Sequence, residues 1–265
     1  MSLRGAPLLY IFLDVYDLDR QRELLEDVVG LPLIEVEPHL PHHRHGVVKY
    51  DAGAIVHSLN LSSKGKFRPD SSDALVTVVG VGPGRGVEAR LDAYGRAERR
   101  PDGTLFTDPC GHHYLFRSAD PAGSDPMVDE LRLAVDDLDA SVAWYGEVLG
   151  LELDGRSGGS AYFNTGSVQL VLQQAGRAAD GRRLRRQVAL LVFYVPRIEE
   201  AHDALAARGL ELGNKRPAYS EIGGTSRFDD PSGNRFCLYE PSDESLGWGS
   251  GSKVLQVAAG RAAVA

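Results

Sequence analysis

The alternation of apolar and polar residues marks a strand near the middle of the chain. Residues 130–135 carry leucine or valine at every second position, the period-two pattern of a half-buried strand. Apolar residues then recur at helical spacing up to Leu149, with Asp139 placed to cap the helix start and Gly150 suited to its left-handed end. Three more strand patterns follow, at residues 151–153, 160–166 and 167–174. This stretch therefore predicts one βαβββ module.

The same order of elements appears again in the rest of the chain. Residues 189–195 predict a strand, 198–207 an amphipathic helix that ends at Gly209, and 235–239 a last strand behind a DPSGN turn. The first half has the same plan, with strands expected at residues 8–15, 47–50, 55–61, 75–81 and 113–117. Four βαβββ modules predict an α+β fold, in which mixed sheets curve into cups and the helices lie outside.

Two internal repeats group these modules into a duplicated unit. Residues 14–33 return as residues 134–153 at an offset of 120, and the DPCG turn at Asp108 returns as DPSG at Asp230, at an offset of 122. A nearly constant offset between unrelated signals indicates two tandem domains. The expected organisation is domain 1 at 1–119, a linker at 120–126, domain 2 at 127–243 and a flexible tail at 244–265.

Composition limits the partners of the protein. The chain has 265 residues, is 43% hydrophobic and carries a formal net charge of −8, which argues against a nucleic-acid or anionic-membrane surface and favours a small-molecule ligand. Cys110 and Cys237 stand at near-equivalent positions of the two repeats, so a disulfide between them is not expected. Together with the lack of a signal-peptide pattern, this favours a cytoplasmic location.

The repeats also carry a family resemblance. The pattern VxDLxxSxxWYxxVLGL at residues 135–151, its looser copy at residues 15–31 and the two DPxG turns resemble the vicinal oxygen chelate superfamily. This superfamily includes glyoxalase I, bleomycin-resistance proteins and type I extradiol dioxygenases. The resemblance covers nearly the whole chain up to Ser242, and its tandem layout is most similar to that of the dioxygenases. It implies a divalent metal held by residues from the first and last strands of the modules.

The metal-ligand positions implied by the resemblance are incompletely filled. They fall on Glu130, Gln169, Leu190 and Cys237 in the second domain and on Tyr10, His57, Val76 and Leu115 in the first. Leucine and valine cannot bind a metal, and neither domain keeps the two histidines and one carboxylate that Fe(II) ring cleavage requires. No metal ligand is therefore assigned, and the identity of any cofactor stays open.

Strand alternation predicts what these positions do instead. With a period of two, the polar side chains of the second domain face the inside of its cup and the leucines face the helices, so the working pocket is expected there. The candidate catalytic residues are Glu130, His57 and Tyr10. The candidate substrate-binding residues are Arg132, Gln169, Gln173, Tyr194, Cys237 and Tyr239. Three roles stay open for Glu130: an ion pair with Arg132, a substrate-facing acid or base, or a metal ligand.

Two loop stretches have alternative interpretations as well. The stretch at residues 39–45 holds His39, His42, His43 and His45, which suit either a solvated loop or a metal site. The stretch at residues 182–186 is rich in arginine, which suits a solvated loop or a clamp for a carboxylate or phosphate.

Two functional classes remain. The chain is expected to bind a small oxygenated or aromatic molecule, either as a binding or resistance protein or as a non-oxidative enzyme that uses an acid or base of the pocket. The alternative is a metal-dependent extradiol dioxygenase or glyoxalase-like lyase with atypical ligands. A homodimer is left open as a further partner.

Overall fold

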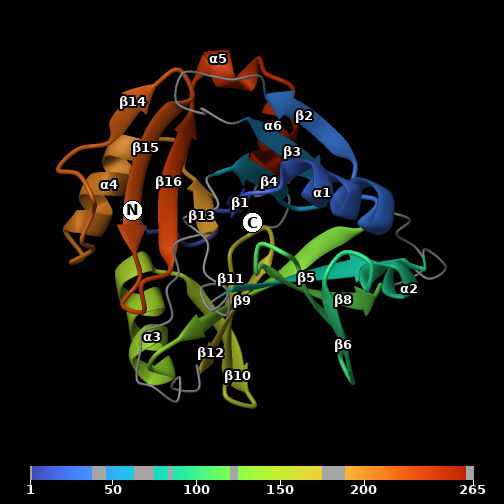
Figure 1. The fold of residues 1–265 in the computed structure, drawn as a ribbon. Helices are drawn as coiled ribbons and strands as arrows, with labels where there is room; N and C mark the ends of the chain where they lie inside the picture. Colours follow the sequence, from blue (N-terminus) through green and yellow to red (C-terminus); the bar gives the residue numbers. More distant parts are fainter. Residues whose placement is uncertain are drawn as a thin grey trace.

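Two sheets of eight strands make up most of the protein, and they lie one above the other with helices outside (Figure 1). This computed structural model describes residues 2–37, 46–62, 75–82, 86–119, 125–174 and 189–260. Sheet A has the strand order β14-β15-β16-β13-β1-β4-β3-β2, and sheet B has the order β10-β11-β12-β9-β5-β8-β7-β6. The expected α+β class with four βαβββ modules is confirmed.

The elements follow the module order predicted from the sequence. The first module contains β1 (Leu8–Val15), α1 (Leu18–Glu23), the π-helical turn η1 (Leu24–Val29), β2 (Leu33–Glu37), β3 (Val47–Asp51) and β4 (Val56–Leu61). The second contains β5 (Leu75–Val81), α2 (Val87–Leu91), β6 (Arg96–Arg100), β7 (Gly103–Thr107) and β8 (His113–Ser118). The third contains β9 (Met127–Val135), α3 (Leu138–Trp144), the π-helical turn η3 (Tyr145–Leu149), β10 (Glu152–Ser157), β11 (Ser160–Asn164) and β12 (Gln169–Gln174). The fourth contains β13 (Ala189–Tyr194), α4 (Ile198–Ala206), β14 (Ala218–Ser220), β15 (Gly223–Asp229) and β16 (Arg235–Pro241), and α5 (Asp243–Leu246) and α6 (Gly251–Gly260) follow it.

Each sheet combines modules from both halves of the sequence. In sheet A the first module joins the fourth, because β1 pairs antiparallel with β13, and in sheet B the second joins the third through β5 and β9. The expectation that the two modules of one half would share a cup is therefore wrong. The first strands are buried on both faces for much of their length, so their side-chain pattern does not specify which neighbour they pair with. The domain boundaries at 1–119 and 127–243 stay a prediction about the repeat units.

The DPxG turns connect the modules within each half. The buried carboxylate of Asp230 accepts a hydrogen bond from Tyr145 Oη at 2.8 Å, and that of Asp108 accepts one from Gln21 Nε2 at 2.7 Å. Each carboxylate also accepts a backbone N–H of its own turn, at Asn234 and His112. The motif thus joins the helix of one module to the hairpin of the next, which explains its repetition.

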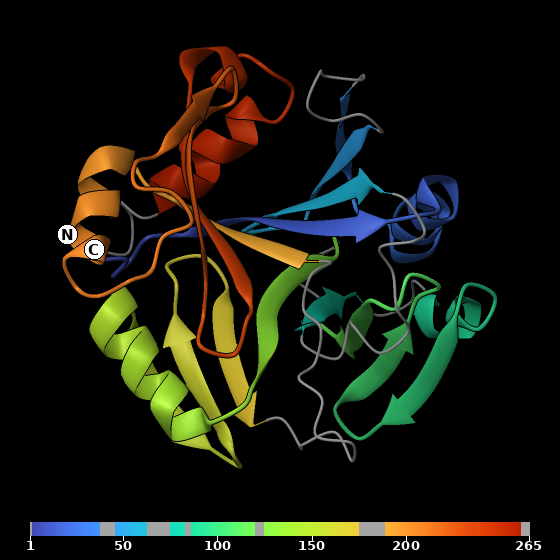
Figure 2. The ribbon, with the colours of Figure 1, turned by 60° about the vertical axis from the view of Figure 1, so that its left-hand side comes forward.

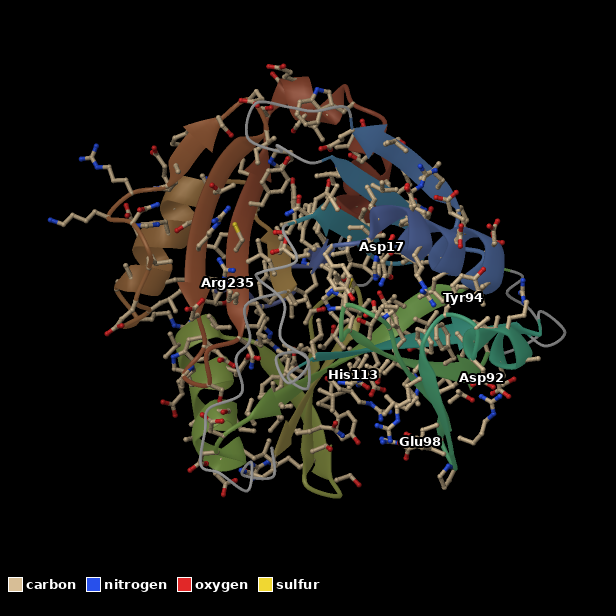
Figure 3. All side chains as sticks on the ribbon, viewed as in Figure 1. Asp17, Asp92, Tyr94, Glu98, His113 and Arg235 are labelled. Atoms are coloured by element: carbon tan, nitrogen blue, oxygen red, sulfur yellow. The ribbon has the colours of Figure 1, made fainter. Side chains whose placement is uncertain are left out.

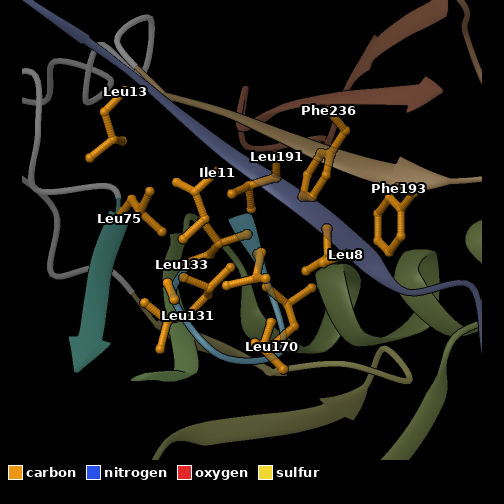
Figure 4. Close-up of a cluster of buried hydrophobic side chains, with 14 of the residues drawn as sticks. Leu8, Ile11, Leu13, Leu75, Leu131, Leu133, Leu170, Leu191, Phe193 and Phe236 are labelled. Carbon is orange, nitrogen blue, oxygen red and sulfur yellow. The ribbon is translucent and has the colours of Figure 1, made fainter. Parts of the chain in front are cut away.

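The main core lies between the two sheets. Leu131 and Leu133 of β9 meet Ile11 of β1 and Leu191 of β13 in one apolar cluster (Figure 4). The leucine face of β9 therefore packs against the other sheet as well as against helices, so the expectation that it would meet helices alone was incomplete. With their convex faces buried against one another, the sheets leave their concave faces for other contacts.

Helix ends and the C-terminal segment differ in part from the expectations. Asp137, not Asp139, caps α3, because its carboxylate accepts the Ala140 N–H at 2.9 Å. Gly150 does end η3 with a left-handed φ of 73°. A flexible tail was predicted at 244–265, and this is wrong for residues 244–260, most of which belong to α5 and α6 beside sheet A (Figure 2).

Candidate functional site

A cavity of about 340 Å³ opens on the concave face of sheet A, between the strands and the C-terminal segment. Strand register shows which side chains form the floor of this cavity. Arg227, Cys237, Val192 and Tyr10 are successive partners across β15, β16, β13 and β1. Arg235, Leu190 and Phe12 lie in the neighbouring row, two residues along each strand on the same face. The floor is therefore apolar and aromatic in the middle and cationic on the side of the fourth module.

The C-terminal segment forms one wall of this cavity. Trp248 and Ser250 line it directly, and the Glu35 carboxylate fixes them by accepting the N–H groups of Gly249 at 3.2 Å and Ser250 at 3.1 Å. In α6, Val254 is buried in an apolar cluster with floor residues of sheet A. The wall is thus held by both backbone hydrogen bonds and apolar packing.

A buried lysine joins this wall to the floor. Lys49 on β3 forms an ion pair with Glu37 and donates a hydrogen bond to Ser250 Oγ at 2.9 Å. Its Nζ also lies 5.7 Å from the centre of the Tyr10 ring and 5.9 Å from that of Trp248. A buried ammonium is tolerated only when it is paired in this way.

Two phenols and one thiol complete the interior, and all three are neutral at physiological pH. Burial raises the pKa of Tyr10, although a hydrogen bond with Ser250 opposes the change. Burial likewise raises the pKa of Tyr239 to about 12 and that of Cys237 to about 11. The Tyr239 hydroxyl donates to the Ile222 carbonyl at 2.8 Å. These groups can donate or accept hydrogen bonds but are poor nucleophiles.

The rim of the cavity carries the remaining charges. Asp14 accepts a hydrogen bond from Asn60 Nδ2 at 2.7 Å, on the first-module side. Arg227 and half-buried Arg235 lie on the opposite side, and Figure 3 shows Arg235 on β16. Among the described residues, Arg227 has no ion-pair partner.

The exchange of modules separates the residues predicted to form one pocket. Tyr10, Cys237 and Tyr239 line the cavity of sheet A, and Tyr194 lies on the same sheet beside Tyr239 but does not line the cavity. The other predicted residues, Glu130, Arg132, Gln169 and Gln173, are all on sheet B. The expected combination of Glu130 with Tyr239 in one cup is therefore wrong, because these side chains stand on different sheets.

In sheet B the candidate acid is held by ion pairs. Glu130 accepts a hydrogen bond from Arg132 and lies 3.5 Å from Arg117, and Arg132 also lies 3.1 Å from Asp102. This arrangement matches the first of the three roles considered for Glu130. Gln169 is the register partner of Glu130, while Gln173 donates to Ser160 Oγ at 3.3 Å.

His57 lies outside the cavity. Register pairs Ile11 with His57 and Tyr10 with Val56, so the side chains of these two candidate catalytic residues point to opposite faces of sheet A. The imidazole is fully buried, 3.4 Å from Tyr114 Oη, and burial together with the nearby His112 lowers its pKa to about 3.

Several cavity residues were missed in the sequence: Glu37, Lys49, Arg227, Arg235, Trp248 and Ser250. Lys49 carried a signal, because it interrupts the otherwise apolar strand of residues 47–50. The histidines at 39–45 and the arginines at 182–186 lie outside the described residues.

The donor groups do not fit the metal site that the superfamily implies. No three His, Cys, Asp or Glu side chains converge in the part of the chain that the structure describes. In sheet A the expected ligand positions bring together Tyr10, Leu190 and Cys237, while His57 points away. Leu190 offers no donor, so no chemical step is assigned to a metal.

Comparisons with known proteins agree with the fold. The model of the Glyoxalase/Bleomycin resistance protein/Dioxygenase superfamily matches residues 127–238. A putative dioxygenase from Bacillus subtilis is similar with a TM-score of 0.69 and 14% identity over 97% of this chain and 96% of that chain. Glyoxalase I from Zea mays is similar with a TM-score of 0.67 and 16% identity over 88% of this chain and 92% of that chain. The chain matches no curated protein.

Residues 127–238 belong to this superfamily, and the chain as a whole has its fold, with four modules that form two cups. At identities this low the comparisons establish the architecture, and any reaction has to be inferred from the site itself. Within the described residues, no helix has the length and apolar character needed to cross a membrane.

Proposed function

We propose that this chain binds a small, partly aromatic molecule in the cavity of sheet A. The observation that carries the proposal is the composition of that cavity, in which an apolar floor is combined with a few fixed polar groups. This combination is typical of ligand pockets, where apolar contacts supply affinity and polar groups set orientation. A volume of about 340 Å³ suits a ligand of one or two rings.

Tryptophan fluorescence can test this binding. The chain has two tryptophans, and Trp144 packs against Tyr145 and Phe228 on the helix side, away from the cavity. In Trp144→Phe, Trp248 is the sole tryptophan and reports on the cavity wall. Small aromatic and oxygenated compounds that raise the melting temperature are then expected to change its emission on binding.

Two matched variants, each with a larger side chain on the floor of one sheet, test where the ligand binds. Val192→Phe adds bulk to the floor of sheet A, and Val171→Phe does so in sheet B, where Val171 is the register partner of Arg132. Binding should be lost in Val192→Phe and kept in Val171→Phe. The opposite result would place the ligand in sheet B and contradict the proposal.

A second candidate is a non-oxidative enzyme that moves a proton. The supporting observation is the hydrogen-bonded connection from Tyr10 through Ser250 and Lys49 to Glu37, which runs from the cavity to a buried ion pair. Such an enzyme would exchange an acidic C–H of a bound compound for deuterium in D2O, which NMR detects. Exchange that persists unchanged in Tyr10→Phe would contradict this role.

A further inference from the structure

The charges of the sheet A cavity are unequally compensated. On the first-module side, Lys49 is neutralised by Glu37 and lies 3.5 Å from Glu35. On the fourth-module side two arginines line the cavity, and Arg227 has no carboxylate partner among the described residues. Asp229 is the nearest acid by register, and it stands opposite Arg235. Among the described residues, the cavity therefore has one cation without an ion-pair partner, at Arg227.

The geometry of the strands brings the two arginines within reach of one ligand group. Arg227 pairs with Cys237 across β15 and β16, and Arg235 is two residues from Cys237 on the same face. Diagonal neighbours of this kind lie about 7–8 Å apart, and somewhat less at Cβ, a separation that two guanidinium groups can bridge to a single carboxylate. Guanidinium is also the side-chain group best matched to a planar acid.

The floor beside these arginines is apolar. Leu190 on β13 and Phe12 on β1 continue the row of Arg235, and Trp248 stands on the opposite wall. Two strand spacings, about 10 Å, separate β16 from β1. This length accommodates one ring and a conjugated acid group laid across the sheet.

Resting on the binding function proposed above, we propose that the ligand is a planar organic acid, with its carboxylate at Arg227 and Arg235 and its unsaturated body over Leu190 and Phe12. The carboxylate supplies the anion that Arg227 lacks. The body covers the apolar floor up to Trp248. Neutral and cationic molecules of the same shape can cover the apolar floor, but they cannot supply an anion to Arg227.

Three probes of one shape and different charge test this ligand class: trans-cinnamate, trans-cinnamamide and trans-cinnamylamine, titrated by calorimetry at neutral pH. Cinnamate should bind about tenfold more tightly than the amide, and the amine should bind most weakly. Arg227→Met should lower cinnamate affinity about threefold to fivefold and leave the amide unchanged, because an exposed arginine contributes mainly through charge. Arg96→Met, an exposed arginine on the edge strand β6, is the matched control and should change neither.

The outcomes distinguish a failure of the planar-acid ligand class from a failure of the proposed binding function. Equal or tighter binding of the amide or the amine, lost in Val192→Phe, would overturn the anionic ligand class and leave the cavity as a binding site. Failure of all three probes, while other compounds bind in a manner lost in Val192→Phe, would overturn the class in the same way. If no compound shows binding that is lost in Val192→Phe, both proposals are overturned.

Discussion

Acidification should destabilise this protein through the buried histidine His57. His57 is fully buried, and burial together with the nearby His112 lowers the pKa of its imidazole from 6.5 to about 3. Its Nδ1 has no hydrogen-bond partner among the described residues, and its Nε2 lies 3.4 Å from Tyr114 Oη. The folded protein therefore keeps His57 neutral at pH values where the unfolded chain has already bound a proton.

The sign and size of the effect follow from these two pKa values. Because the unfolded state binds the proton first, the free energy of unfolding is highest above pH 6.5 and falls as the pH drops toward about 3. Within this window each pH unit removes about 1.4 kcal/mol. The change from pH 7 to pH 5 is therefore about 2 kcal/mol, a large share of the stability of an ordinary domain.

Urea unfolding of three proteins at pH 7 and pH 5 measures this contribution. His57→Phe keeps a ring in the site and removes the titrating group, so its loss of stability on acidification should be smaller than that of the parent by about 2 kcal/mol. Tyr114→Phe removes the neighbouring hydroxyl and keeps the imidazole, so it should retain the parental pH dependence. If His57→Phe loses as much stability as the parent, the histidine is not responsible and the reasoning fails.

Three further predictions concern the sheet A cavity. Lys49→Met should lower the free energy of unfolding by about 3–5 kcal/mol in urea, since the buried Glu37 carboxylate loses its cation; an unchanged value would contradict the role of the ion pair. Val254→Asp should detach α6 and shift Trp248 emission to longer wavelength in a Trp144→Phe background, whereas Leu255→Asp on the exposed side of α6 should not; equal shifts would refute the packing. Cys237 should react with a disulfide reagent about 100-fold more slowly in the folded protein than in urea, because its pKa is raised to about 11; equal rates would contradict its burial.

Local periodicity was sufficient to predict the modules. A strand such as β9 and the turn at Gly150 are encoded by residues close together in the chain, so alternation and a left-handed glycine identify them. The pairing of modules depends on contacts between residues far apart in the chain, such as Tyr10 with Val192 in sheet A and Leu75 with Leu133 in sheet B. The strand β1 is buried over most of its length, and nothing in its own pattern distinguishes β13 from any other partner.

The incorrect part of the predicted site follows from that pairing. Period-two counting identified Cys237 and Tyr239 as facing a cup, and they do line the cavity of sheet A. The same counting could not show that Glu130 faces a different cup. The wall was missed for another reason, because glycines around Trp248 hid the apolar spacing of Val254 and Val257 in the helix that follows.

The two cups show why similar modules need not contribute equally to function. In sheet B, Glu130 and Arg132 satisfy one another and Asp102 adds a further ion pair, so a ligand would have to displace existing contacts. In sheet A, Glu37 neutralises the buried charge of Lys49, while the apolar floor and Arg227 line the cavity. A ligand there gains contacts without breaking any that hold the fold. The symmetry of the repeats does not distinguish the two cups. The reason to propose the binding site in sheet A is that its apolar floor and Arg227 are available for contacts with a ligand.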